Sequence, residues 1–165
     1  MKELYIYGSG TIARETIKLV KKINIKKKIW KIKGLVDNYI KNRKKIDDID
    51  LINEEKVINN LNTYAICAIS EPFVKKKVIS KIKKRKIKLT SLICPEVHIY
   101  PDTKIGKGSI ILSNSQIGHT SIIGENILLS FGVDVGHNVN ISNYCTILPN
   151  SNIGGYSKIG SCVLI

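Results

Sequence analysis

Between residues 93 and 165, every sixth residue of this chain is aliphatic. Six members of the series are followed directly by glycine, and the residue four positions after most members is small or β-branched. A period of six suits neither an α-helix nor a free amphipathic strand. It is typical of a parallel β-helix, in which triangular coils stack and bury one continuous core. The thirteen members are Ile93, Ile99, Ile105, Ile111, Ile117, Ile123, Leu129, Val135, Ile141, Ile147, Ile153, Ile159 and Ile165.

The same repeat predicts which side chains point inward. Successive side chains of a strand point to opposite faces, so the aliphatic residue and the residue four positions later share the inside of the prism. The residue that directly follows the aliphatic one faces outward. With one hexad on each side, a coil takes about 18 residues, so residues 93–165 predict about four coils.

Charge divides the chain at the same place. Residues 1–92 carry 24 of the 27 lysines and arginines and nine of the 13 acids, a net charge of +15. Residues 93–165 carry a net charge of −1. Because the change of composition coincides with the start of the repeat, we predict two domains, residues 1–92 and residues 93–165.

Composition also argues against several classes of protein. A basic half attracts nucleic acid or phosphorylated ligands, but the lysine runs have few interleaved aromatic residues and no nucleic-acid motif. We interpret them as solvated and expect no nucleic-acid partner. No apolar run approaches the roughly 20 residues of a membrane span, and we expect no signal peptide. The four cysteines lack metal-ligand spacing. These features predict a cytoplasmic protein.

A glycine-rich turn follows the first apolar run, Glu3–Tyr7. It reads G-x-G-x-x-A from Gly8 to Ala13 and leads directly into a helical pattern. In this context the glycines let a ligand approach the backbone, and the helix N-terminus attracts phosphate. A second strand, Trp30–Val36, ends at Asp37, where an acid commonly meets a ribose hydroxyl. The pattern favours a mononucleotide or nucleotide-sugar site.

The remaining elements before residue 93 complete a small α/β unit. A third strand over Tyr64–Ile69 precedes a helix that begins near Pro72, and a last strand covers Lys88–Leu92. We predict a Rossmann-like domain with three or four parallel strands. The alternative, that the glycine turn only joins a strand to a helix, stays open. A unit of this size lacks the second half of a dinucleotide fold, which argues against a nicotinamide-dependent enzyme.

Two histidines, His119 and His137, are 18 residues apart and therefore occupy equivalent corners of successive coils. A metal site is one reading, because a stacked histidine pair resembles the site of hexapeptide-fold carbonic anhydrases. That resemblance requires a second histidine five residues after one of these, where this chain has Gly124 and Ser142. Surface histidines without a role are the second reading. The third makes His137 a general base, since imidazole titrates near neutral pH and accepts a proton from an attacking amine or hydroxyl.

Taken together, residues 3–165 resemble the sialic acid O-acetyltransferase/nucleotide-sugar N-acetyltransferase family of bacterial surface-glycan synthesis. The segment S-F-G-V-D-V-G-H-N-V-N-I, Ser130–Ile141, is similar to the family's stretch around its catalytic histidine. The segment P-N-S-N-I-G-G, Pro149–Gly155, is similar to the family's following coil. The resemblance implies an α/β Rossmann-like domain followed by a left-handed parallel β-helix of hexapeptide repeats.

The resemblance also implies roles. His137 and Asn138 would be the catalytic residues, with His137 as the general base that lets a sugar amine or hydroxyl attack acetyl-CoA. Gly155 would bind this co-substrate and direct a backbone N–H at the thioester carbonyl. The acceptor, a sugar or nucleotide-sugar, would be held by Gly8, Ser9, Gly10 and Asp37. No metal is implied. Family members are homotrimers with active sites between subunits, so a second copy would complete the site.

Two features depart from the family pattern. An acid usually follows the catalytic histidine, whereas this chain has Asn138, which fixes geometry but supplies no negative charge. The chain stops at Ile165, on an inward-facing residue, so we expect the β-helix to be truncated at its C-terminus. These departures leave a second hypothesis open, a non-catalytic trimeric protein that binds a nucleotide-sugar or acts as a scaffold.

Overall fold

The computed structural model describes residues 1–39 and 44–165. The chain begins with a six-stranded sheet of order β3-β4-β2-β1-β5-β6, in which β3 is antiparallel to β4 and the other neighbours are parallel. The strands are β1 Lys2–Tyr7, β2 Trp30–Val36, β3 Lys45–Ile46, β4 Ile49–Ile52, β5 Thr63–Cys67 and β6 Lys88–Leu89.

Two α-helices accompany this sheet, α1 over Thr11–Lys26 and α2 over Pro72–Lys84. Each has an apolar stripe that it buries, because its apolar residues recur at helical spacing. The start of α2 is well defined: Glu71 accepts hydrogen bonds from the first-turn N–H groups, and proline follows directly. The start of α1, in contrast, has Gly10 as its N-cap and no side-chain cap.

The Rossmann-like domain predicted for residues 1–92 is wrong. A doubly wound unit carries a helix in each crossover between parallel strands, but among the described residues only β1–β2 and β5–β6 are joined through an α-helix. The connection from β2 to β4 contains the hairpin strand β3, and the one from β4 to β5 contains a short 3₁₀ helix, η1, Glu54–Lys56. Residues 37–62 are rich in Asp and Asn, which favour turns. The chain is thus a left-handed β-helix with a sheet at its start.

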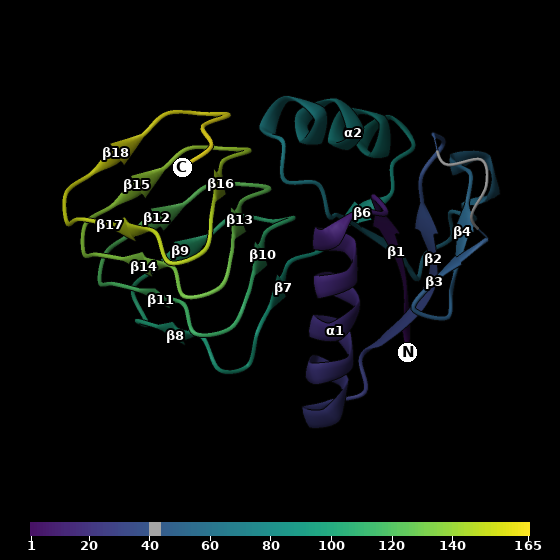
Figure 1. Ribbon diagram of the computed structural model, residues 1–165, viewed down its shortest axis with the longest axis horizontal. Coiled ribbons are helices and arrows are strands. Elements are labelled where there is room, and N and C mark those ends of the chain that lie inside the picture. Colours follow the sequence, from purple (N-terminus) through teal and green to yellow (C-terminus); the bar gives the residue numbers. More distant parts are fainter. Residues whose placement is uncertain (40–43) are drawn as a thin grey trace.

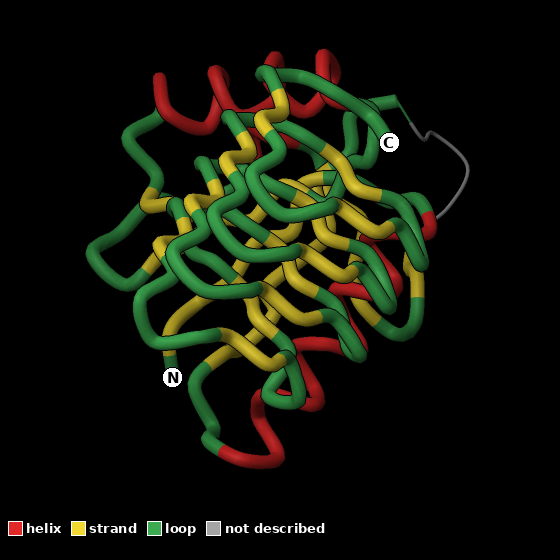
Figure 2. The backbone as a smooth tube through the Cα atoms, turned by 90° about the vertical axis from the view of Figure 1, so that its left-hand side faces the viewer, coloured by secondary structure: helices red, strands yellow, loops and turns green. Residues whose placement is uncertain are grey.

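The parallel β-helix predicted from the hexapeptide period is confirmed. Two-residue strands form three parallel four-stranded stacks, which correspond to four coils. The first stack contains β7 Leu92–Ile93, β10 Ile110–Ile111, β13 Leu128–Leu129 and β16 Thr146–Ile147; the second contains β8 His98–Ile99, β11 Gln116–Ile117, β14 Asp134–Val135 and β17 Asn152–Ile153; the third contains β9 Lys104–Ile105, β12 Ile122–Ile123, β15 Asn140–Ile141 and β18 Lys158–Ile159. Figure 2 shows the coils as a regular ladder.

The interior of the coils combines aliphatic packing with buried serines. The aliphatic series from Ile111 to Ile153 lies in one buried cluster, as the parity argument predicts. At three of the fifth hexad positions, Ser109, Ser115 and Ser121, the serine hydroxyl links two coils. Ser115 Oγ, for example, donates to Ser130 O at 2.8 Å and accepts from Val133 N at 3.2 Å. Ser109 and Ser121 make equivalent bonds to the next coil, so these buried hydroxyls are satisfied.

The corners of the coils also repeat with period six. From residue 108 to residue 162, every sixth residue has a φ between 56° and 77°, in the left-handed region. Glycine and asparagine adopt this conformation at little cost, and six of the ten positions carry one of them. The ten are Gly108, Asn114, Thr120, Asn126, Gly132, Asn138, Tyr144, Asn150, Tyr156 and Cys162.

The sheet and the β-helix share one hydrophobic core. Apolar residues of β1, β2 and α1 pack in the same buried cluster as Leu92, Ile110 and Leu128 of the first stack. Figure 1 shows α1 between the sheet and the β-helix, with α2 along the upper edge of the view. The boundary predicted between residues 92 and 93 falls within β7, and the division into two domains stays a prediction. No helix in residues 1–39 and 44–165 is long and apolar enough to cross a bilayer.

Candidate functional site

A cleft of about 580 Å³ opens at the carboxyl ends of β1, β2 and β5. All four residues predicted to hold the acceptor line it: Gly8, Ser9, Gly10 and Asp37. Residues from α2 and from two coils of the β-helix complete its wall, among them Val74, Phe131 and Leu148. Ligands of open parallel sheets bind outside the carboxyl ends of the strands, so the cleft lies where a ligand is expected.

Ser9 and Asp37 are connected across the cleft. Ser9 Oγ donates to Asp37 Oδ2 at 2.5 Å, and the other carboxylate oxygen accepts from Tyr39 N at 2.9 Å. This pairing fixes the carboxylate at the end of β2 and turns it toward the glycine turn. A carboxylate held in this way still has lone pairs for ligand hydroxyls.

The two glycines of the turn have different reasons for lacking a side chain. Gly8 has a φ of +117°, and a Cβ there would lie 2.8 Å from Ala68 O. The fold itself therefore demands glycine at this position. A Cβ on Gly10 would meet nothing within 4 Å, so the space beside Gly10 is open to the cleft.

The charges around the cleft constrain its ligand. Its lining holds the carboxylates of Glu15, Asp37 and Glu54 and the ammonium group of Lys81. An anionic ligand would therefore depend on Lys81 and on the first-turn N–H groups of α1, which no side chain caps. Tyr7 forms part of the floor, and burial raises the pKa of its hydroxyl to about 12.

A buried lysine holds the α2 wall of the cleft against the β-helix. Lys75 Nζ donates to Cys145 O at 3.0 Å and to Thr146 Oγ1 at 2.7 Å, and Thr146 Oγ1 in turn donates to Ser70 O at 2.5 Å. The Lys75 side chain is 1% exposed, and this burial lowers its pKa from 10.5 to about 8. The network joins the loop between β5 and α2, α2 itself and β16 at one point.

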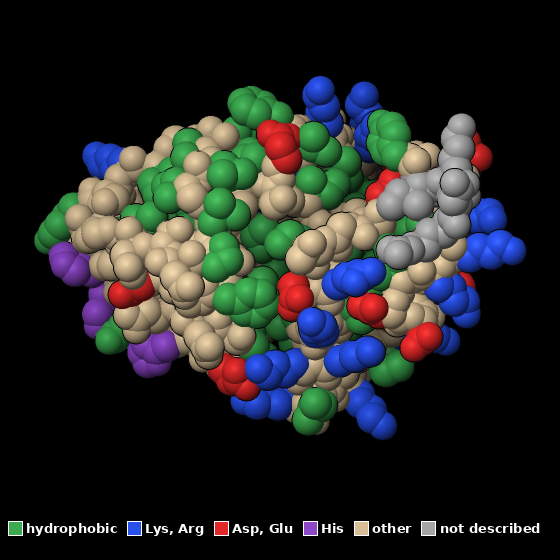
Figure 3. All heavy atoms as spheres, viewed as in Figure 1, with side chains coloured by type: hydrophobic (Ala, Val, Ile, Leu, Met, Phe, Trp, Pro, Cys, Tyr) green, Lys and Arg blue, Asp and Glu red, His purple; other side chains and the backbone are tan. Residues whose placement is uncertain are grey.

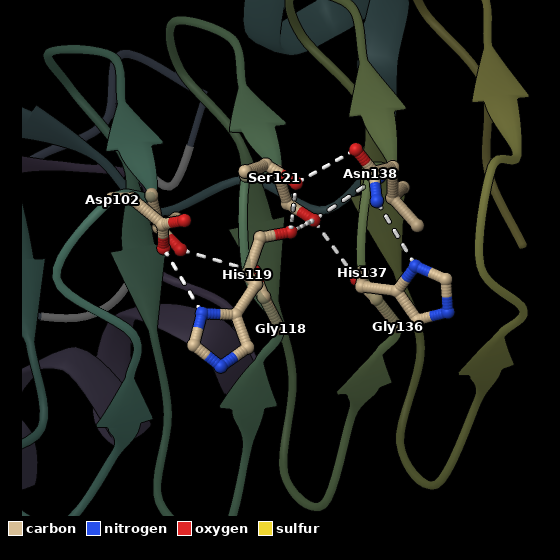
Figure 4. Close-up of polar contacts among 10 residues, drawn as sticks. Asp102, Gly118, His119, Ser121, Gly136, His137 and Asn138 are labelled. Carbon is tan, nitrogen blue, oxygen red and sulfur yellow. Dashed lines mark hydrogen bonds and ion pairs between the residues drawn. The ribbon is translucent and has the colours of Figure 1, made fainter.

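His137 lies on the corner between β14 and β15 (Figure 4). The amide of Asn138 is 3.0 Å from its Nδ1, and the Tyr156 ring packs edge-on against the imidazole at 5.0 Å between centroids. Gly155, one coil further, lies under the outer edge of the ring, where a Cβ would come within 2.9 Å of Nε2. The structure thus brings together the three residues predicted for this site, His137, Asn138 and Gly155.

His119 occupies the equivalent corner of the preceding coil. Its Nδ1 is 3.4 Å from Asp102 Oδ1, and its ring stacks on Tyr100 with 3.7 Å between centroids. His119 therefore has an acid partner, whereas His137 has an amide. Within the described residues, no three His, Cys, Asp or Glu side chains gather in a way that could hold a metal ion.

The cleft and His137 lie at different corners of the prism. Phe131 and Leu148, which line the cleft, follow strands of the first stack, whereas His137 follows a strand of the second stack. Figure 3 shows the histidines on the edge of the β-helix that faces away from the N-terminal sheet. One chain therefore does not place His137 at its own cleft.

Sequence reasoning missed two residues that organise these places. Lys75 belongs to a run of three lysines, but it falls on the buried stripe of α2, a signal that helical periodicity contains. Thr120 stands in the period-six series of left-handed positions. Gly or Asn recurs at six of these ten positions, and this recurrence can be seen in the sequence. A β-branched threonine at one of them is the signal that could have drawn attention to Thr120.

The sequence matches no family model and no curated protein at a significant level. Solved structures, in contrast, are similar over nearly the whole chain. A histidine-to-asparagine mutant of perosamine N-acetyltransferase from Caulobacter crescentus, in complex with CoA and GDP-perosamine, has a TM-score of 0.86 and 17% identity, covering 99% of this chain and 77% of that one.

Two further structures show the same likeness. The acetyltransferase domain of PglB from Neisseria gonorrhoeae, in complex with acetyl coenzyme A, has a TM-score of 0.88 and 16% identity over 99% of this chain and 78% of that one. WeeI from Acinetobacter baumannii has a TM-score of 0.71 and 13% identity over 99% and 94%. At such identities the likeness establishes the fold, and function has to be argued from the site.

Proposed function

We propose that this protein is an acetyl-CoA-dependent acetyltransferase that acts on an amine or hydroxyl of a sugar or nucleotide-sugar. The observation that carries the proposal is the corner at His137, where an exposed imidazole is held at Nδ1 by Asn138 and directs Nε2 over Gly155. Neighbours of the same fold support it, because one binds CoA with GDP-perosamine and another binds acetyl coenzyme A.

In this proposal His137 is the general base. Its Nε2 accepts a proton from the acceptor's amine or hydroxyl as the nitrogen or oxygen attacks the thioester carbonyl of acetyl-CoA. The carbon–sulfur bond then breaks, and CoA leaves as the thiol or thiolate. Gly155 N makes no backbone hydrogen bond within the described chain, so it is free to donate to the developing oxyanion, a contribution of about 3 kcal/mol in comparable sites.

The cleft is the proposed acceptor site. The nucleotide phosphates would lie at the first turn of α1 beside Gly8, Ser9 and Gly10, and Asp37 would accept a hydrogen bond from a ribose hydroxyl. Because His137 does not reach the cleft of its own chain, a second copy has to supply it. We propose a homotrimer in which the cleft of one subunit meets the His137 corner of the next. A cytoplasmic location and a role in surface-glycan synthesis belong to the same proposal.

The test is release of CoA thiol from acetyl-CoA by the purified protein, with a panel of amino- and hydroxy-sugars, free and nucleotide-linked. Release that depends on one acceptor and disappears in His137→Gln supports the proposal. His119→Gln is the matched control, because His119 occupies the same corner one coil earlier. Equal loss in both variants, or release without an acceptor, contradicts the assignment of the base.

The acceptor site is tested separately with Gly10→Ala. Its Cβ would meet no protein atom within 4 Å, so the variant should fold normally while its methyl group occupies space beside the proposed phosphate position. We expect a higher KM for the nucleotide-sugar and an unchanged KM for acetyl-CoA.

Binding of CoA and nucleotide-sugar by the wild-type protein without turnover, in a folded trimer, would favour the alternative of a non-catalytic binding or scaffold protein.

A further inference from the structure

Thr120 has a backbone conformation that its residue type disfavours. Its φ is +57°, and it is the one β-branched residue among the ten left-handed corner positions between residues 108 and 162. Asparagine and glycine take this conformation readily, whereas a β-branched residue is strained in it. Such strain persists where other interactions hold the residue, and it concentrates at functional sites.

The hydroxyl of Thr120 links a main-chain carbonyl to Asn138, the residue beside His137. Thr120 Oγ1 lies 2.7 Å from His119 O and 2.7 Å from Asn138 Oδ1. Asn138 Nδ2, at the other end of the amide, lies 3.0 Å from His137 Nδ1 (Figure 4). A continuous chain of hydrogen bonds therefore runs from a main-chain carbonyl through Thr120 and Asn138 to the imidazole.

The protons of this chain can be assigned by elimination. A carbonyl oxygen only accepts, and the threonine hydroxyl has one proton to donate. If that proton goes to Asn138, then Thr120 Oγ1 and His119 O face one another at 2.7 Å with no proton between them. If it goes to His119 O, which also accepts from Asn138 N at 2.8 Å, the Asn138 amide has to be turned by 180° from the orientation in Figure 4. Its NH₂ group then donates to Thr120 Oγ1, and its oxygen faces His137 Nδ1. The orientation of an amide is decided by such a network.

The second arrangement places a proton in every contact and fixes the imidazole. With the Asn138 oxygen as acceptor, His137 Nδ1 carries the ring proton and Nε2 keeps its lone pair. We propose that Thr120 is a positioning residue that acts through Asn138 to hold His137 in the Nδ1–H tautomer. The catalytic meaning of this state rests on the proposed function, because only a free Nε2 lone pair can take the acceptor's proton.

The proposal also explains how an amide serves where an acid would be expected. A carboxylate can only accept from Nδ1–H, so it selects the tautomer by itself. An amide offers a donor and an acceptor, and it selects nothing unless a neighbour fixes its orientation. Thr120 supplies that constraint, because its own proton is committed to His119 O.

The tautomer is read directly by ¹⁵N NMR of histidine-labelled protein without substrates, with the three histidines assigned by single replacement with glutamine. We expect Nδ1–H and an unprotonated Nε2 for neutral His137 in the wild-type protein and in Thr120→Ser, which keeps the hydroxyl. Thr120→Val keeps the branched shape without the hydroxyl. It should shift the tautomer ratio toward Nε2–H by about fivefold, the value of one neutral hydrogen bond.

Thr120→Gly guards against a folding defect in the valine variant. Glycine relieves the strain at φ +57°, so this variant should unfold at a higher temperature than the wild-type protein, yet lose the Nδ1–H preference like Thr120→Val. Wild-type His137 in the Nε2–H form, or an unchanged ratio in both variants, would overturn the proposal.

Acetyl transfer provides the second readout. Thr120→Val should lower kcat by up to about fivefold, in proportion to the lost Nδ1–H tautomer, with little change in KM, and Thr120→Ser should keep the wild-type kcat. The NMR measurement needs no turnover, so an inactive protein with the expected tautomer would count against the acetyltransferase proposal and not against the role of Thr120. An active protein whose His137 tautomer does not change on substitution of Thr120 would count against the role of Thr120 and not against the acetyltransferase proposal.

Discussion

Replacing Lys75 by methionine should remove a rise in folding stability that the wild-type protein shows above pH 8. Burial lowers the pKa of Lys75 from 10.5 to about 8. Between these values the unfolded chain binds a proton that the folded chain has already released. The free energy of unfolding therefore increases with pH across this window, with a limiting slope of about 1.4 kcal/mol per pH unit. Over the whole window the increase amounts to about 3 kcal/mol.

Neighbouring thiols restrict where this effect is read most cleanly. Burial raises the pKa of Cys67 from 9.0 to about 12. Above pH 9 the folded chain therefore keeps a proton that the unfolded chain loses, and stability falls with pH on account of this group. Cys67 is present in both wild type and Lys75→Met, so most of its effect cancels when their unfolding free energies are subtracted. Measurements between about pH 7.5 and about pH 9 avoid the range in which the thiol of the unfolded chain loses its proton.

The assay is urea unfolding followed by circular dichroism, at one protein concentration and in steps of half a pH unit. Lys77→Met, at an exposed position on the same helix, controls for the loss of one positive charge. We expect the wild-type free energy to rise by roughly 1 kcal/mol over the interval, with the rise retained in Lys77→Met and absent in Lys75→Met. A wild-type curve parallel to that of Lys75→Met would refute the reasoning, because Lys75 would then not titrate in the folded protein.

Three further substitutions test the site and the core. Gly155→Ala would place a Cβ 2.9 Å from the Nε2 of His137, so it should displace the ring and lower kcat at least tenfold, whereas Gly154→Ala, which meets nothing within 4 Å, should leave acetyl transfer unchanged. Gly8→Ala, at a φ of +117°, should destabilise the fold by about 1–3 kcal/mol in urea unfolding, and a loss below about 0.5 kcal/mol would contradict the strain argument. Ile141→Ala, at a fully buried position, should cost about 2–5 kcal/mol in the same assay, and a cost near zero would show that the coils collapse around the lost methyl groups.

The sequence alone determined the β-helix, because its signal is strictly periodic. An inward aliphatic residue at every sixth position leaves the chain one efficient way to bury that face, and the series from Ile111 to Ile153 is indeed buried. The sequence also indicated the turn at Gly8, since a glycine between a strand and a helix reports a local backbone requirement. Both signals arise from short-range geometry, which a single sequence records.

The order and connections of the N-terminal sheet were not determined in this way. The segment after β2 has few apolar residues to indicate a strand. The short strand β3 forms there only through its antiparallel pairing with β4. The glycine motif suggested a Rossmann-like domain because it specifies one strand, turn and helix. It carries no information about the crossovers that follow.

The relations between distant residues belong to the tertiary structure. Only the packing of α2 on β16 buries Lys75 and lowers its pKa, and only the stacking of coils brings Thr120, Asn138 and His137 into one hydrogen-bonded chain. The spacing of 18 residues placed His119 and His137 on one edge of the prism, but it said nothing of the corner that the cleft occupies. Burial and hydrogen bonding depend on which residues are neighbours in space. A periodic sequence pattern specifies these neighbours for the stacked coils, but not for the contacts between the coils and other elements.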